Sequence, residues 1–296
     1  MTDSTALSQK AHTTTSFYQH AEALRTGACW YLVDQAKHPE VLRLLFEQDP
    51  VAIYDLPYIY SQYREQAFDG PLIIQPTTAQ SEEWLHRWMT EGKALALHGQ
   101  ALKLEEIREH FVSLNTVRTP NGDSLFRYAD SATLGSLGTS LSPHQRLRIL
   151  GPLTAIHGCY AGASWALTKV QPSALQDELK KQPPQPLELT QENLACVEAH
   201  RRHLLAKALA EGNGENDGED NGLEAQTVSY WFQQLETLGA PNEQGLVEGA
   251  GLLITQGFTR VLSDDELATI RKTRQGAYWS DTLKVLATLS HSQDGT

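Results

Sequence analysis

The run Cys29-Trp30-Tyr31-Leu32-Val33 decides how the N-terminal part of this chain folds. Its side chains are apolar and include aromatic and β-branched residues, which is typical of a strand buried on both faces. His38-Pro39 follows, and because proline is favoured in the first turn of a helix, we expect a helix to begin there. One face of that helix would carry Val41, Leu42, Leu45 and Phe46. The stretch therefore predicts a buried strand followed by an amphipathic helix.

The same alternation recurs twice downstream. Residues 72–75 and 94–97 are short apolar runs, and each precedes a segment with helical periodicity. Residues 116–118 and 125–128 then flank Pro120-Asn-Gly-Asp123, a turn sequence that predicts a hairpin. Strands that alternate with helices favour an α/β lobe. We therefore expect a mixed sheet with flanking helices and with the hairpin attached to it.

Beyond this lobe the apolar residues follow a helical period only. Four prolines lie in residues 171–187, which predicts a linker, and Ser263-Asp-Asp-Glu266 is a capping box that would start a late helix. We expect an all-α C-terminal lobe. The expected organisation is a flexible N-terminus over residues 1–16, an α/β lobe over 17–170, the linker over 171–187, and a helical lobe over 188–290 with an acidic loop at 211–222.

Charge and composition exclude several classes of protein. The chain has 296 residues and a net charge of -12, and residues 188–296 alone hold 8 Lys and Arg against 17 Asp and Glu. Nucleic-acid binding needs clustered basic residues, so this half is a poor nucleic-acid surface. No apolar run approaches the length of a membrane span, and the polar start lacks the apolar stretch of a secretory signal. We expect a cytoplasmic protein that binds neither nucleic acid nor membrane.

Two enzymatic or metal-binding features compete with a binding role. Gly162-Ala-Ser-Trp-Ala166 resembles a nucleophile elbow, so a serine hydrolase using Ser164 is one alternative, with His200 or His203 as its base. The same two histidines are one helical turn apart, but no third ligand lies near them in the sequence. The sequence predicts no metal and no cofactor.

The acidic loop offers a further alternative, a calcium-responsive regulator. Five residues occupy EF-hand positions 1, 3, 5, 6 and 12, and these are Asn213, Glu215, Asp217, Gly218 and Glu224. Position 8 holds Asp220, where paired loops carry an apolar residue. A solvated linker explains this composition more simply.

Aromatic residues crowd the segment from Tyr54 to Tyr63. Tyr58 and Tyr60 lie between them, and the spacing is too irregular for one helix face. The segment is either a packed irregular loop or an exposed aromatic strip that binds a partner. Both interpretations remain open at the level of the sequence.

Four fragments give the first lobe a family resemblance. They are Trp30-Tyr-Leu-Val-Asp-Gln-Ala36, Gly70-Pro-Leu-Ile-Ile74, Phe126-Arg-Tyr-Ala-Asp130 and Leu147-Arg-Ile-Leu-Gly-Pro152. In this order and spacing, the region from about Cys29 to Trp165 resembles the adaptor chaperones that load effectors onto the spike of the bacterial type VI secretion system. Ser131-Ala-Thr133 departs from the family, which commonly has a proline and an arginine after the aspartate.

The resemblance implies a non-catalytic role. Such an adaptor holds a cognate effector, by its N-terminal region or by amphipathic helices, and hands it to the C-terminal part of a VgrG spike protein in the cytoplasm. We expect the partner to lie between the two lobes. The candidate partner-binding residues are Tyr31, Asp34, Tyr58, Tyr60, Arg127, Asp130 and Trp231. Asp34, Arg127 and Asp130 would alternatively form a buried ion pair that holds the first strand to the hairpin.

Overall fold

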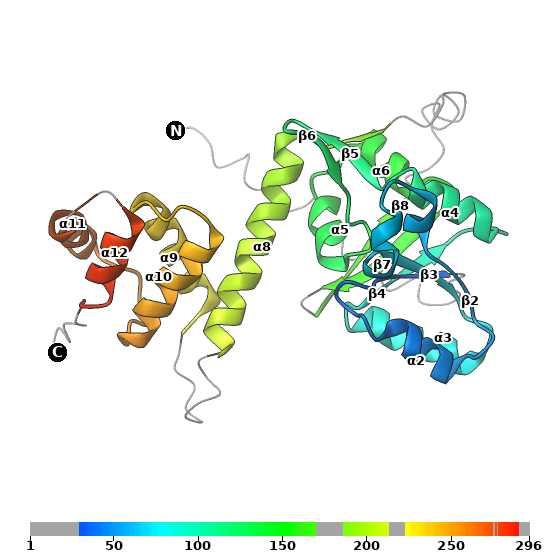
Figure 1. Ribbon diagram of the computed structural model, residues 1–296, viewed down its shortest axis with the longest axis horizontal. Helices are drawn as coiled ribbons and strands as arrows, with labels where there is room; N and C mark the ends of the chain where they lie inside the picture. Colours follow the sequence, from blue (N-terminus) through cyan, green and yellow to red (C-terminus); the bar gives the residue numbers. More distant parts are fainter. Residues whose placement is uncertain are drawn as a thin grey trace, which may run out of the picture. The chain divides into compact units, whose positions relative to one another are not determined.

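The computed structural model describes residues 30–160, 162–169, 186–212, 223–274, 276 and 278–289. The chain divides into two compact units, Met1–Val197 and Glu198–Thr296. Figure 1 labels their helices and strands in chain order. The first unit contains the strands together with the helices that pack on them, and the second is helical, so the predicted fold class is confirmed.

The first unit is built on a six-stranded sheet with the strand order β2-β3-β1-β4-β7-β8. Its strands are β1 (Trp30–Asp34), β2 (Ile53–Asp55), β3 (Pro71–Gln75), β4 (Ala94–His98), β7 (Ala155–Tyr160) and β8 (Ala163–Thr168). Every neighbouring pair in this sheet is antiparallel. Because β3 and β4 both pair with β1, they run parallel to each other on either side of it. The apolar run that opened the analysis therefore forms the central strand.

Helices cover both faces of this sheet. The first, α2 (Val41–Gln48), lies with α3 (Ala79–Thr90) on the face that carries Tyr31 and Val33 (Figure 1). The opposite face of β1 packs into a second core, which includes residues of α4 (Leu104–Val112), α5 (Ser131–Gly138) and α6 (Pro143–Leu150). Burial of all five β1 residues follows from this double cover and explains why the run has no polar alternation.

The predicted hairpin forms, but the expectation that it belongs to the main sheet is wrong. Its strands β5 (Thr116–Thr119) and β6 (Gly122–Leu125) make a separate sheet with β9 (Leu187–Glu188), which pairs parallel to β5. The second strand also ends earlier than expected. Phe126 and Tyr128 are buried in the core, because after Leu125 the chain turns inward instead of extending the ladder.

Two short helices of the first unit were not predicted. Ser142 and Gln145 cap α6 reciprocally, and the Asp130 carboxylate accepts from the Ala132 N–H at the start of α5.

The tyrosine-rich segment forms two 3₁₀ turns, η1 (Pro57–Tyr60) and η2 (Arg64–Asp69). Both turns lie between β2 and β3 in the sequence. The first of them, η1, packs against β3 and α4.

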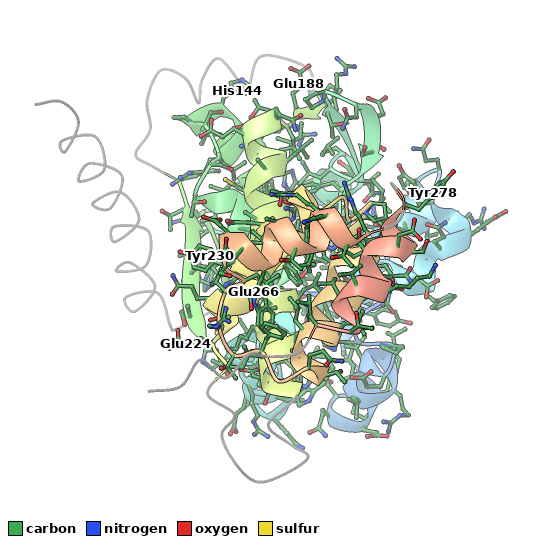
Figure 2. The ribbon with its side chains drawn as sticks, turned by 90° about the vertical axis from the view of Figure 1, so that its left-hand side faces the viewer. His144, Glu188, Glu224, Tyr230, Glu266 and Tyr278 are labelled. Atoms are coloured by element: carbon green, nitrogen blue, oxygen red, sulfur yellow. The ribbon has the colours of Figure 1, made fainter. Side chains whose placement is uncertain are left out.

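The second unit is helical, as predicted. Its helices are the C-terminal part of α8 (Gln191–Gly212), α9 (Ala225–Thr237), α10 (Glu243–Thr255), α11 (Asp264–Thr273) and α12 (Trp279–Leu286). The predicted capping box at Ser263 and Glu266 starts α11. Hydrogen bonds from Arg260 are the main cause that lowers the pKa of Glu266 to about 2. Burial opposes this shift, and hydrogen bonds from Ser263 add to it. Glu266, labelled in Figure 2, is therefore charged at neutral pH and can accept the hydrogen bonds that cap α11. Among the described residues, no helix combines the length and apolarity needed to cross a bilayer.

Two histidines of the first unit are held neutral by the fold. The His110 Nε2 lies 2.8 Å from the Ile149 carbonyl oxygen, and the buried His157 ring packs 4.6 Å from the His98 ring. Burial is the main cause that lowers both pKa values to about 4. The positive charge of Arg148 acts in the same direction on His110, and His98 does so on His157.

Acidification should therefore destabilise the first unit before its carboxylates titrate. Between pH 6.5 and 4, His110 and His157 bind protons in the unfolded chain but not in the folded chain. The free energy of unfolding therefore decreases as the pH falls. We expect a loss of about 2 kcal/mol for each histidine between pH 7.5 and pH 5. Urea unfolding at the two pH values measures it. His110→Gln, which keeps a donor for Ile149, should show a smaller pH dependence, and an equal dependence would contradict the assignment.

Candidate functional site

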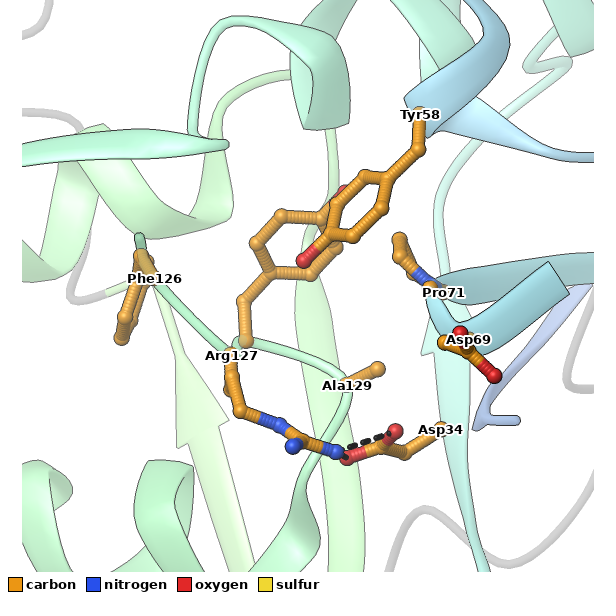
Figure 3. Close-up of a pocket in the computed structure, with 9 residues that line it drawn as sticks. Asp34, Tyr58, Asp69, Pro71, Phe126, Arg127 and Ala129 are labelled. Atoms are coloured by element: carbon orange, nitrogen blue, oxygen red, sulfur yellow. Dashed lines mark hydrogen bonds and ion pairs between the residues drawn. The ribbon is translucent and has the colours of Figure 1, made fainter. Parts of the chain in front are cut away.

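A small cleft lies where three distant segments of the first unit meet (Figure 3). It is lined by Asp34, Tyr58, Asp69, Gly70, Pro71, Phe126, Arg127, Tyr128 and Ala129. Its volume of about 10 Å³ admits one water-sized group. Three of the four fragments that carry the family resemblance contribute to this lining, although they are far apart in the sequence.

An ion pair closes one side of the cleft. Asp34 is the last residue of β1 and is buried, and the Arg127 Nη2 donates to its Oδ1 and Oδ2 at 2.7 and 2.5 Å. Burial alone would lower the pKa of Arg127, but the hydrogen bond and charge of Asp34 outweigh it and raise this pKa. The guanidinium therefore stays charged and ties β1 to the segment that follows β6.

A second ion pair lies beside the first. The Lys37 Nζ is 2.8 Å from the Asp130 Oδ1, and Asp130 is also the N-cap of α5. The Thr133 hydroxyl donates to the Asp130 Oδ2 at 2.9 Å. At Ser131-Ala-Thr133, where the chain departs from the family pattern, it thus still forms a capped helix.

The floor of the cleft is set by a glycine. The buried Gln35 side chain donates to the carbonyl oxygens of Ala67 and Gly70 at 3.2 and 3.3 Å, which fixes the corner between η2 and β3. A Cβ atom on Gly70 would lie 2.4 Å from the Tyr58 Cδ2. Only glycine allows the Tyr58 ring to lie against this corner.

Tyr58 presents a hydroxyl to the cleft without a protein partner. The residue is only 4% exposed, its ring end faces the cleft (Figure 3), and no described residue accepts from the hydroxyl. Burial raises the pKa of Tyr58 to about 12; the Arg127 charge opposes this shift, and the Asp34 charge adds to it. The hydroxyl is therefore protonated at neutral pH and can donate.

The structure brings some of the predicted contact residues together and separates others. Asp34, Tyr58 and Arg127 line the cleft. Asp130 directly follows the lining residue Ala129 and forms an ion pair with Lys37. Tyr60 lies outside, 54% exposed, with the Arg108 guanidinium 4.6 Å from its ring centre. The tyrosine-rich segment is therefore partly packed and partly exposed, and partner binding by its exposed residues stays a prediction.

Tyr31 and Trp231, two of the predicted contact residues, are buried in this structure. Tyr31 belongs to the core between the sheet and helices α2 and α3, because β1 is covered on both faces. Trp231 is 0% exposed in the core of the second unit. Neither side chain offers a partner any surface in this conformation.

Sequence reasoning missed most of the apolar lining. Tyr128 stacks on Phe111, and its hydroxyl donates to the Asn115 Oδ1 at 2.8 Å. Phe126 and Tyr128 point inward while Arg127 between them points outward. This alternation was visible in the sequence as an aromatic-Arg-aromatic run, whereas the contribution of Asp69 and Gly70 depends on the path of η2.

The hydrolase alternative loses its structural basis. Ser164 is not on a strand-turn-helix elbow but inside β8, where it pairs with Cys159 across a hairpin. Among the described residues, no three His, Cys, Asp or Glu side chains gather closely enough to hold a metal ion. The proposed calcium loop falls almost entirely in residues 213–222, outside the described part of the chain.

Comparison with known families matches part of the first unit. Residues 29–148 match the family model described as Domain of unknown function (DUF4123). The match extends from the start of β1 into α6 and includes every residue that lines the cleft. No curated protein and no solved structure matches the chain.

These residues resemble a DUF4123 domain, and the match covers less than half of the chain. The family is that of the type VI secretion effector adaptors, which the four sequence fragments also indicated.

Proposed function

We propose that this protein is a non-catalytic adaptor that binds a type VI secretion effector in the cytoplasm and delivers it to a VgrG spike protein. The observation that carries the proposal is the DUF4123 match over residues 29–148. The placement of Ser164 inside a strand, where a nucleophile elbow cannot form, adds support against hydrolysis. In this proposal Asp34, Tyr58, Tyr60, Arg127 and Asp130 lie at or near the effector contact.

Co-purification from the native cell tests the role. The tagged full-length protein should retain one effector and a VgrG protein, both identified by mass spectrometry. Recovery of neither, in cells that express the secretion system, would refute the adaptor role.

A matched variant separates the adaptor from the hydrolase. Ser164 is exposed and has no catalytic geometry, so Ser164→Ala should recover the same partners in the same amounts. Loss of an esterase activity in this variant would instead support the enzyme.

A further inference from the structure

Two residues of the cleft, Arg127 and Tyr58, have hydrogen-bond donors for which the described residues supply no acceptor. Arg127 donates to Asp34 from its Nη2, and no described residue accepts from its Nε or Nη1. The Arg127 side chain is 45% exposed. Tyr58 is 4% exposed as a whole, and no described residue accepts from its hydroxyl. The hydroxyl oxygen itself is not fully buried, and the Arg127 side chain is half-exposed, so acceptors that a partner supplies can reach both groups.

The charges around the cleft decide which acceptors fit. Asp34, Asp69 and Asp130 bring three negative charges against the two positive charges of Arg127 and Lys37. This excess of negative charge would repel a carboxylate or a phosphate. A neutral oxygen, such as a main-chain carbonyl, takes the same hydrogen bonds without that repulsion.

The turns that carry Tyr58 and Asp69 also expose large apolar side chains. Phe68 is 70% exposed next to Asp69, and Ile59 and Tyr60 are exposed next to Tyr58. Large exposed apolar residues on the turns that also supply cleft residues favour a protein-binding surface over these turns. We call Ile59, Tyr60 and Phe68, which η1 and η2 expose but which do not line the cleft, the apolar rim.

We propose that an apolar polypeptide segment of the partner lies over η1 and η2, packs on the apolar rim, and presents main-chain carbonyl oxygens to the Tyr58 hydroxyl and the Arg127 guanidinium. This inference rests on the proposed function, since it names the chemistry by which the adaptor grips its effector. It commits to recognition of the partner's backbone, so the partner segment needs no particular polar side chain.

The test uses a displayed random peptide library, because the effector is not needed for it. Peptides selected by the wild-type full chain are synthesised and titrated by fluorescence anisotropy. Tyr58→Phe removes only the unpartnered hydroxyl and should weaken binding about tenfold at an unchanged melting temperature. Phe68→Ala, on the rim, should weaken binding by a similar factor.

Tyr63→Phe is the matched control. Tyr63 lies in the same segment, but its hydroxyl is already hydrogen-bonded to the Thr116 Oγ1 at 3.1 Å. This variant should bind the peptides as tightly as the wild type does. Alanine substitution of each polar residue of a selected peptide should also leave its dependence on Tyr58 intact.

Several results would overturn the inference. They are equal affinity in wild type, Tyr58→Phe and Phe68→Ala, a selected consensus that is acidic, or a single polar peptide side chain that accounts for the Tyr58 dependence. The inference would also be overturned if the library yielded no peptide whose binding depends on Tyr58. Failure of the adaptor role itself is read separately, from co-purification with the wild-type chain.

Discussion

Trp231→Ala is expected to lower the free energy of unfolding of the second unit by about 3–5 kcal/mol. The Trp231 ring is completely buried in the core of that unit, and its truncation leaves a cavity that the surrounding helices cannot fill without moving. Its Nε1–H also donates to the Arg260 carbonyl oxygen at 2.8 Å, which ties α9 to the segment before α11. The variant loses this link together with the packing.

Amide hydrogen exchange followed by mass spectrometry measures this effect locally. Peptides from α9 to α12 should exchange faster in Trp231→Ala, while peptides from β1 to β4 should not change. Tyr230→Ala is the matched control, because Tyr230 is the adjacent aromatic residue and is exposed (Figure 2). Its effect should stay within about 0.5 kcal/mol. Unchanged exchange in Trp231→Ala together with lost partner binding would restore Trp231 as a contact residue.

Much of the first unit follows from local signals. The apolar run at β1 and the helical periods of α2, α3 and α4 are strong because each element buries a whole face or stripe. The short helices α5 and α6 were missed because their apolar content is brief, although their caps at Asp130 and Ser142 are readable. Local signals do not reveal which sheet a strand joins, and the partner of β5, β9, lies some 70 residues further along the chain.

The cleft shows the same division between local and long-range information. Asp34 and Arg127 stand out in the sequence as charges in apolar surroundings, and they do form a pair. The pairing of Asp130 with Lys37, and the Tyr58 ring lying on Gly70, depend on how three segments meet. Tyr31 and Tyr60 illustrate the limit most clearly, since two similar side chains have opposite fates according to whether helices cover them.

Arg127→Ala is expected to lower the free energy of unfolding of the first unit by about 2–4 kcal/mol. Among the described residues, the substitution leaves the buried Asp34 carboxylate with the Ala36 N–H, at 3.2 Å, as its one donor. We place the value below that of a fully buried pair because the Arg127 side chain is partly exposed and screened by solvent. Thermal and urea unfolding of the full chain measure it.

Asp34→Ala should cost less than Arg127→Ala, because the half-exposed guanidinium can rehydrate whereas the buried carboxylate cannot. The double variant should then regain part of the stability that Arg127→Ala loses. If instead the two single variants cost the same and the double variant costs their sum, the pair contributes no coupling and the assignment of a structural role fails.

Arg127→Lys separates the structural role from the contact role. Lysine keeps a positive charge that can reach Asp34, so most of the stability should remain, but it lacks the additional guanidinium donors that the proposed partner contact uses. A stable Arg127→Lys protein that retains its effector poorly would show that one residue serves both purposes. Equal retention by lysine and arginine would confine Arg127 to holding β1 against the segment after β6. Because Arg127→Ala would remove both roles at once, loss of binding in that variant alone could not distinguish them.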